Sequence, residues 1–336
     1  MRTRLAVTVT TLLLALALPG AAGAREAGQT QGSERARTIA YWTAERIAHA
    51  IPRDFEKNAA GKIAAKGKPP GGGSGAVTGA SWSGNGLIET QSGRALFTMG
   101  GVDYICSASV IDDAAEDNLY STVLTAGHCV FDAADGWATN WMYIPRFDDA
   151  PTYTCSSAYY GCWTATRLAA HHKFVTAGGF NDQAVAVDFA FARVGLGGKG
   201  AVGTIELDGT THGYGLKIGG VALTNTLWAF GYPAAGKYRG KNLTYCKGSL
   251  INDPYGANTW GMACNMTGGS SGGPWIADTL NPGTTEGSVA SLNSYGYTGL
   301  TYMFGPKFTA DTATIQGDVI DGGASPGVTQ VRDLVP

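Results

Sequence analysis

The sequence predicts an all-β protein, and three observations support this prediction. Glycine is abundant, with 50 of 336 residues. Short apolar segments alternate with glycine-containing turns, and the second half lacks long amphipathic helical patterns. Many short strands joined by such turns are typical of β-sandwiches and β-barrels. The length suffices for one large domain or two small ones, each with its own core.

The first 24 residues have the pattern of a secretory signal peptide. A basic start is followed by a mostly apolar segment, Leu5 to Leu18, and by the small residues Ala22-Gly23-Ala24. The apolar segment is too short to span a bilayer stably, so a membrane anchor is the less favoured alternative. We therefore expect cleavage after Ala24 and a soluble protein that is secreted to the extracellular medium.

Residues 25–79 differ from the later part of the chain, because they contain no cysteine and are rich in lysine. Ser33 is expected to cap a helix that extends to Ala50 and stops before Pro52. A linker with the sequence Pro-Pro-Gly-Gly-Gly-Ser-Gly lies at residues 69–75. A propeptide with a cleavable linker is the favoured interpretation. A short accessory domain and a disordered arm are the alternatives.

Strand patterns begin near Ser81. Arg94–Thr98 and Asp103–Ile111 are expected to form a hairpin around Gly100-Gly101. Further on, Val185–Val194 is predicted to be a buried strand, apolar apart from Asp188. The glycine-rich stretch from Gly195 to Gly215 is expected to connect two domains, which places one barrel at 80–200 and a second barrel with its tail at 201–336.

Charge and cysteine content restrict the class of function. Basic and acidic residues number 24 and 26, so the sequence has neither a nucleic-acid-binding nor a membrane-binding signature. Six cysteines in a secreted chain indicate three disulfides, for which 15 pairings are possible. A metal site is disfavoured because no C-x-x-C pair occurs. The pairs expected from their positions are Cys106 with Cys129, Cys155 with Cys162, and Cys246 with Cys264.

Three short motifs supply the residues of a nucleophilic mechanism. Ser271 lies in the sequence Gly-Gly-Ser-Ser-Gly-Gly-Pro, which can turn sharply and expose a hydroxyl beside backbone N–H groups. His128, in Thr-Ala-Gly-His-Cys, can accept the serine proton, and Asp188 can orient the imidazole. Asp182 is a rival carboxylate that is expected in a solvated turn. His171 and His172 are rival bases that are expected at the surface.

These motifs, in this order, resemble the three signature blocks of the chymotrypsin/trypsin-like serine proteases. The resemblance covers roughly residues 95–300 and implies two perpendicular antiparallel β-barrels with the active site in the crevice between them. It also implies an oxyanion hole formed by the N–H groups of Gly269 and Ser271. Ser291 matches the family's serine strand, which supports the aspartate and lines the substrate groove.

Two departures from the family pattern concern activation and specificity. Ser270 stands where many members carry the aspartate that pairs with a new N-terminal amine, so activation by amine insertion is not expected. Asn265 stands where trypsin-like members carry an aspartate, and the stretch Ala290-Ser291-Leu292-Asn293 lacks the histidine typical of glutamyl endopeptidases. A neutral, polar specificity pocket is therefore expected, formed by Asn265, Met266, Ser291, Leu292 and Asn293.

The sequence thus predicts a secreted serine endopeptidase, made as a zymogen, that hydrolyses peptide bonds through an acyl-enzyme. No metal or organic cofactor is implied, the expected partner is a protein or peptide substrate, and a monomer is expected. A non-catalytic binding protein on a protease scaffold is an alternative, because folds can outlive their chemistry. An esterase that uses the same three residues is another.

Overall fold

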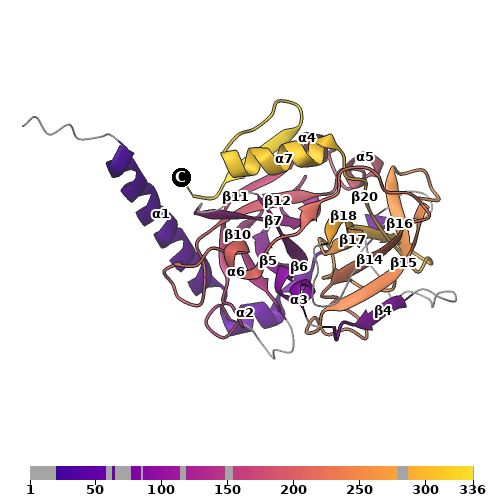
Figure 1. Cartoon of the computed structure of the whole chain (residues 1–336), viewed down its shortest axis with the longest axis horizontal. Helices are drawn as coiled ribbons and strands as arrows, with labels where there is room; N and C mark the ends of the chain where they lie inside the picture. Colours follow the sequence, from indigo (N-terminus) through magenta and orange to yellow (C-terminus); the bar gives the residue numbers. More distant parts are fainter. Residues whose placement is uncertain are drawn as a thin grey trace, which may run out of the picture.

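The computed structural model describes residues 20–57, 63–64, 77–84, 86–113, 119–147, 154–277 and 287–335. Most of the expected signal peptide and the expected linker at 69–75 lie outside these ranges. Two β-barrels stand side by side, and a separate N-terminal helix projects from the first (Figure 1). The predicted all-β, two-barrel fold is confirmed. Among the described helices, none combines the length and apolarity needed to cross a membrane.

The first barrel is closed by backbone hydrogen bonds in the order β5-β10-β11-β12-β7-β6 and back to β5. The expected hairpin is formed by β5 and β6, and its turn residues Gly100 and Gly101 both have positive φ, at 58° and 81°. Glycine adopts this conformation without strain. The six strands are β5 (Ser92–Met99), β6 (Val102–Ile111), β7 (Tyr120–Thr125), β10 (Thr139–Pro145), β11 (Trp163–His171) and β12 (Ala190–Gly195).

The second barrel is a half-barrel, in the order β18-β17-β14-β15-β16-β20. Its end strands, β18 and β20, approach closely at Gly305, where an added Cβ would lie 2.0 Å from the carbonyl oxygen of Leu292. A side-chain hydrogen bond from Ser291 Oγ to the Pro306 carbonyl joins the same two strands. The six strands are β14 (Thr226–Gly231), β15 (Thr244–Asn252), β16 (Thr259–Ala263), β17 (Pro274–Ala277), β18 (Ser288–Leu292) and β20 (Tyr302–Pro306).

Short elements extend these sheets at their edges. β19 (Tyr295–Tyr297) pairs with β20, and β4 (Val77–Ser81) pairs with β15. The other short elements of the two barrels are α3 (Leu87–Gln91), the 3-10 turn η1 (Gly127–Cys129), β8 (Phe131–Asp132), β9 (Gly136–Trp137), α4 (His172–Thr176), α5 (Asp182–Val185), α6 (Asp208–Thr211) and β13 (Gly215–Leu216).

The C-terminal residues form a helix and a strand that are not among the elements expected from the sequence. α7 (Ala310–Asp321) begins at a capping box in which Thr309 and Thr312 bond reciprocally, and it ends at Gly322 with a φ of 76°. Its buried residues Thr312, Ile315 and Val319 lie on one helical face, as their spacing requires. The following β21 (Thr329–Asp333) pairs antiparallel with β11.

The predicted strand over residues 185–194 is partly wrong. α5 includes Val185, and β12 begins only at Ala190, so Asp188 lies in the connection between them. Asn181 explains the helix, because its side chain accepts hydrogen bonds from the backbone N–H groups of Gln183 and Ala184. Asp188 is nevertheless fully buried, as the apolar surroundings in the sequence indicated.

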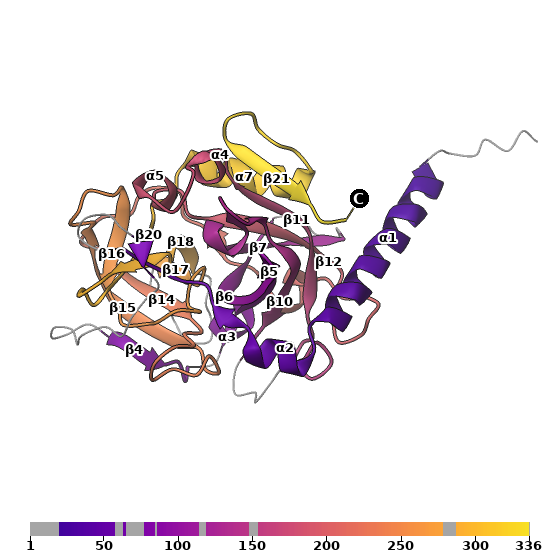
Figure 2. The ribbon, with the colours of Figure 1, turned by 180° about the vertical axis from the view of Figure 1, so that it is seen from behind.

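The N-terminal segment is helical at first and then runs across both barrels. The single helix expected from Ser33 to Ala50 is instead two helices, because Trp42 is buried and donates its indole N–H to the Asn140 carbonyl, and Thr43 caps the second helix. Figure 2 shows the chain passing from α2 toward the second barrel. The segment comprises α1 (Gly20–Tyr41), α2 (Ala44–His49), β1 (Ile51–Pro52), β2 (Phe55–Lys57) and β3 (Ile63–Ala64).

Candidate active site

His128 and Asp188 form a buried, hydrogen-bonded pair. His128 lies in η1, directly after β7. Its Nδ1 atom lies 2.8 Å from Asp188 Oδ2, and its backbone N–H donates to Asp188 Oδ1, also at 2.8 Å. Gly127 permits this approach, because an added Cβ would lie only 3.0 Å from Asp188 Oδ1. One contact holds the imidazole and the other holds the backbone of His128 on the same carboxylate, and the Nε2 atom has no hydrogen-bond partner among the described residues.

A third group holds the same carboxylate. Ser294 Oγ donates to Asp188 Oδ2 at 2.5 Å. The family resemblance implied this supporting role for the strand of Ser291, and that expectation is wrong for Ser291, because its Oγ donates to the Pro306 carbonyl and links β18 to β20. Ser294 lies between β18 and β19, three residues further along. The signal that could have identified it is its position directly before the Tyr-Gly-Tyr strand at the edge of the sheet.

Ser271 lies in a tight loop between β16 and β17. Gly269 and Gly272 have φ values of 92° and 84°, a region that favours glycine. An added Cβ on Gly272 would lie 2.3 Å from the Ser107 carbonyl oxygen, so no larger residue fits there. Within the described residues, the backbone N–H groups of Gly269 and Ser271 donate no hydrogen bond. Both therefore remain available to an oxygen atom that enters the site.

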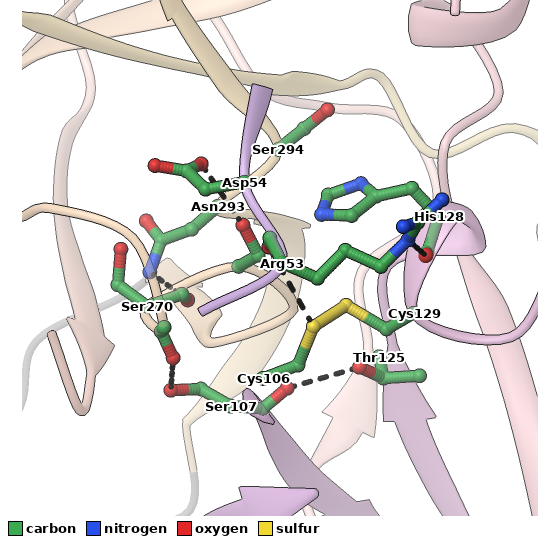
Figure 3. The surroundings of a disulfide bond; sticks show 12 residues. Arg53, Asp54, Cys106, Ser107, Thr125, His128, Cys129, Ser270, Asn293 and Ser294 are labelled. Carbon is green, nitrogen blue, oxygen red and sulfur yellow. Dashed lines mark hydrogen bonds between the residues drawn. A yellow bond between two sulfur atoms is a disulfide. The ribbon is translucent and has the colours of Figure 1, made fainter. Parts of the chain in front are cut away.

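Strand β6 fixes the histidine turn and the serine loop relative to each other. Cys106 in β6 is joined by a disulfide to Cys129, the residue after His128. The next residue, Ser107, donates its backbone N–H to the Ser271 carbonyl at 2.7 Å and its hydroxyl to the Gly269 carbonyl at 2.8 Å. Figure 3 shows this disulfide together with Ser107 and the loop at Ser270. The three described disulfides have the expected pairing: Cys106–Cys129, Cys155–Cys162 and Cys246–Cys264.

Ser270 and Asn293 complete the support of the loop. Ser270 Oγ donates to the Thr267 carbonyl at 2.8 Å, so its hydroxyl is satisfied locally. The Asn293 amide donates to the carbonyls of Phe230 and Ser270, and its oxygen accepts from the Trp275 indole N–H. These three bonds occupy the amide of Asn293, which therefore braces the serine loop.

The remaining residues of the expected specificity pocket lie in different surroundings. Asn265 Oδ1 accepts a hydrogen bond of 2.5 Å from the Tyr238 hydroxyl, so it has a polar neighbour as expected. Met266 and Leu292 are fully buried in the hydrophobic cores. The role of these residues in specificity stays a prediction.

The alternative carboxylate and the two alternative histidines make contacts away from Ser271. Asp182 is largely exposed and forms an ion pair with Lys57. His171 is buried rather than at the surface, because its Nε2 atom bonds to Asp311 Oδ2 at 3.1 Å and thereby joins β11 to α7. Burial lowers the pKa of His171 despite this carboxylate. The ring of His172 lies near the amide of Gln330 in β21.

The N-terminal segment passes directly over this site. Asp54 Oδ1 accepts a hydrogen bond of 3.3 Å from Ser271 Oγ, and the Phe55 ring meets the His128 ring edge-on at 5.2 Å. Arg53 donates its Nε–H to the His128 carbonyl at 2.9 Å. Figure 3 shows Arg53 and Asp54 between the loop at Ser270 and His128. Both Ser271 and His128 are consequently only 1% exposed.

One geometric arrangement in the site resembles a metal-binding cluster. Sulfur atoms of Cys106 and Cys129 and a ring nitrogen of His128 lie within 4.8 Å of one another. The two sulfur atoms are joined in a disulfide, so neither is the thiolate that a metal ligand requires.

Comparison with known proteins identifies the family. No family model matches the chain, and no curated protein sequence matches it. Among solved structures, the protease Anisep from Arthrobacter nicotinovorans is 31% identical, with a TM-score of 0.59 over 72% of this chain and 99% of that one. The thermostable serine protease AL20 from an extremophilic microorganism is also 31% identical, with a TM-score of 0.55 over 68% of this chain and 96% of that one.

A Glu endopeptidase shares the fold at 19% identity, with a TM-score of 0.52 over 72% of this chain and 95% of that one. Two barrels, a buried His–Asp pair and a glycine-bounded serine loop define a serine protease scaffold. The chain belongs to the family of chymotrypsin-like serine proteases.

Proposed function

We propose that the chain is a secreted serine endopeptidase with Ser271 as nucleophile, His128 as general base and Asp188 as the group that orients His128. The observation that carries the proposal is that Ser271 and His128 contact the same short segment of the chain. Consecutive residues, Asp54 and Phe55, contact Ser271 and His128 respectively. The hydroxyl and the imidazole therefore face the same cleft, which is what proton transfer between them requires.

The proposed reaction follows from these positions. Ser271 Oγ attacks the carbonyl carbon of the peptide bond while His128 Nε2 accepts the serine proton. The N–H groups of Gly269 and Ser271 stabilise the negative oxygen that forms. The proton then passes to the leaving amine, the C–N bond breaks, and water hydrolyses the acyl-enzyme by the reverse sequence. Asp188 orients the imidazole and stabilises the imidazolium throughout.

We further propose that residues 25–79 are a propeptide that keeps the protease inactive. A peptide substrate must reach Ser271, and the segment from Ile51 to Lys57 occupies that space, with a short strand at each end that pairs with one of the two sheets. β1 pairs with β6, and β2 pairs in parallel with β19. The group that meets Ser271 Oγ is the Asp54 side-chain carboxylate. A carboxylate is a poor electrophile, so the segment covers the nucleophile with a group that it does not readily attack.

Secretion is part of the same proposal. It is supported by the apolar N-terminal sequence and by the pairing of all six cysteines, because such disulfides persist in oxidising compartments.

Activity of the full chain before and after limited proteolysis tests the proposal. Wild type and Ser271→Ala are produced as full chains, treated identically with a second protease, and separated from it. We expect proteolysis to activate the wild type toward casein and quenched peptides, and we expect Ser271→Ala to be at least about a thousandfold less active.

Equal activity of the two proteins would show that Ser271 is not the nucleophile. A folded wild type that cleaves neither peptides nor esters after removal of the segment would favour the binding-scaffold alternative. Cleavage of esters alone would favour the esterase. A full chain that is already fully active while intact would contradict the zymogen proposal.

A further inference from the structure

We call residues Ile51 to Lys57 the covering segment. Asp54 contacts Ser271, and the segment continues from there to either side of the cleft. Ile51 and Pro52 lie along β6 on one side, and Lys57 lies along β19 on the other. If the proposed function is correct, a peptide substrate replaces this segment and extends along the same two sides. The chemistry of each side therefore bears on which substrates bind.

On the β19 side, the protein already holds a cation. The Lys57 side chain is only 1% exposed, and its Nζ atom forms an ion pair with Asp182. The same Nζ lies 5.4 Å from the ring centre of Tyr295 and 5.9 Å from that of Tyr297. Aromatic faces attract cations, and more strongly when water is excluded. We call Tyr295, Tyr297, Asp182 and Asp253 the aromatic cradle.

Three of the four cradle residues, Tyr295, Tyr297 and Asp253, belong to the second barrel and are held by bonds that do not involve Lys57. The hydroxyls of Tyr295 and Tyr297 both donate to Asp253 Oδ2, at 2.6 and 2.8 Å. Burial is the main reason why the pKa values of both phenols lie well above the usual range, so the rings stay neutral. When the segment leaves, two fixed rings and two carboxylates remain beside β19, and these groups suit a basic side chain.

On the β6 side, a cavity of about 260 Å³ is lined by basic side chains, whereas the aromatic cradle contains carboxylates. Its lining includes Arg94, Arg239 and Lys241 and contains no acidic residue. Arg94 is 2% exposed, and its Nη2 atom donates to the carbonyls of Tyr232 and Gly240 at 2.9 and 2.7 Å. Its Nε and Nη1 atoms have no hydrogen-bond partner among the described residues. Burial lowers the pKa of Arg94 to about 10.

A bound anion would neutralise the basic side chains of this cavity. A buried charge without a counter-ion is unfavourable, and a guanidinium binds carboxylates through paired N–H groups. The cavity adjoins the reaction site, because its lining residue Ala234 donates its backbone N–H to the Gly268 carbonyl at 2.7 Å. One wall of the cavity is formed by Ile47, Ala48, Ala50 and Pro52 of the proposed propeptide, so departure of the propeptide opens the basic side of the cavity to a substrate. A carboxylate of a bound peptide is the acidic group that a substrate would bring to this place.

We propose that the cleft selects peptides by opposite charges on the two sides of the scissile bond. An acidic side chain enters the Arg94 cavity on the β6 side, and a basic side chain enters the aromatic cradle on the β19 side. The proposal deepens the proposed protease function and rests on it.

Quenched peptides of one length test the proposal on the proteolytically activated full chain. One set carries glutamate and lysine on opposite sides of the cleaved bond, a second exchanges them, and a third is uncharged. We expect kcat/KM to be at least tenfold higher for one charged arrangement than for its exchange, and we expect the difference to shrink at high ionic strength.

Variants assign the two halves of the preference. Asp182→Asn should weaken the preference for the basic residue and leave that for the acidic residue intact. The double variant Arg239→Gln/Lys241→Gln should do the reverse, and it avoids the folding risk of replacing buried Arg94. Lys307→Gln is the control, because this lysine lies over Trp260. If Lys307→Gln changes the preference as much as the two test variants, the assignment is wrong.

Failure of this inference can be told apart from failure of the proposed function. If the wild type cleaves all three sets equally while Ser271→Ala is inert, the charge selection is refuted and the protease function stands. If the wild type cleaves nothing, binding of the same peptides to Ser271→Ala is measured by fluorescence anisotropy. A tenfold difference in affinity between the charged arrangements would support the two subsites, and equal affinity would refute them.

Discussion

Arg53→Ala should partly uncover the active site of the intact chain. The Arg53 side chain is 8% exposed and makes two polar contacts, a 2.9 Å bond to the His128 carbonyl and a 2.5 Å ion pair with Asp132. A hydrogen bond from a charged donor contributes about 1.5–3 kcal/mol. Asp132 is 25% exposed, so water can solvate it in the variant and the ion pair adds little more. The variant should therefore lose about 2–3 kcal/mol of the free energy that holds the segment over the cleft.

This loss predicts a measurable change in the population of the open cleft. Since each 1.4 kcal/mol corresponds to a factor of ten, the open population should rise by about 30- to 150-fold. The assay is the rate at which a fluorophosphonate probe labels Ser271 in the uncut full chain, with chain integrity checked on a gel. The same rate measured after proteolytic activation should be unchanged.

Arg46→Ala is the matched control. Arg46 belongs to the same N-terminal segment and also pairs with an aspartate, Asp103, at 2.9 Å, but its side chain is 48% exposed and lies outside the cleft. Its removal should leave the labelling rate of the uncut chain unchanged. Equal labelling rates for Arg53→Ala and the wild type would refute the idea that this strand blocks Ser271.

Two further predictions concern Asp188 and Asp318. In the activated enzyme, Asp188→Asn should lower kcat by about 10⁴ with little change in KM, because an amide no longer holds the imidazole in the productive tautomer; steady-state kinetics would show whether the loss is that large. Burial raises the pKa of Asp318, but hydrogen bonds from Thr329 and Ser325 outweigh it and hold the pKa below its usual value. Its stabilising contribution is therefore present above the unfolded-state pKa and is lost as pH falls through the folded-state pKa. Urea unfolding between about pH 6 and pH 2 should show that Asp318→Asn is less stable than the wild type at pH 6 and that its free energy of unfolding falls less steeply in acid. The same dependence of the free energy of unfolding on pH in both proteins would contradict this.

The sequence was sufficient for the features that depend on local motifs. The positions of His128 and Ser271 follow from distinctive motifs, and Asp188 follows from a lone carboxylate in an apolar run. The hairpin at Gly100-Gly101 follows from turn chemistry. Each of these signals lies within a few neighbouring residues, so one sequence can carry it.

Features that depend on contacts between distant segments could not be predicted in the same way. Ser294 reaches Asp188 across 106 positions of sequence, and its place before Tyr-Gly-Tyr marks the start of a strand without naming the carboxylate that it contacts. The covering residues Arg-Asp-Phe-Glu-Lys lack the alternation typical of a strand, and Phe55–Lys57 form one because β19 imposes the pairing. The capping box of α7 uses Thr312 where the sequence signature of this motif has Glu or Gln, so the sequence did not reveal it.

The support of the serine loop bears on how the proposed zymogen would be activated. Ser270 cannot form the ion pair with a new N-terminal amine that its family position often makes, and its hydroxyl is already bonded to Thr267. The loop is instead braced by Ser107 and Asn293, whose contacts do not involve the N-terminal segment. These bonds already exist in the intact chain, so removal of the segment is not needed to order the serine loop. Under the proposed function, inactivity of the intact chain must come from physical cover of Ser271, and activation requires departure of the covering strand as well as its cleavage.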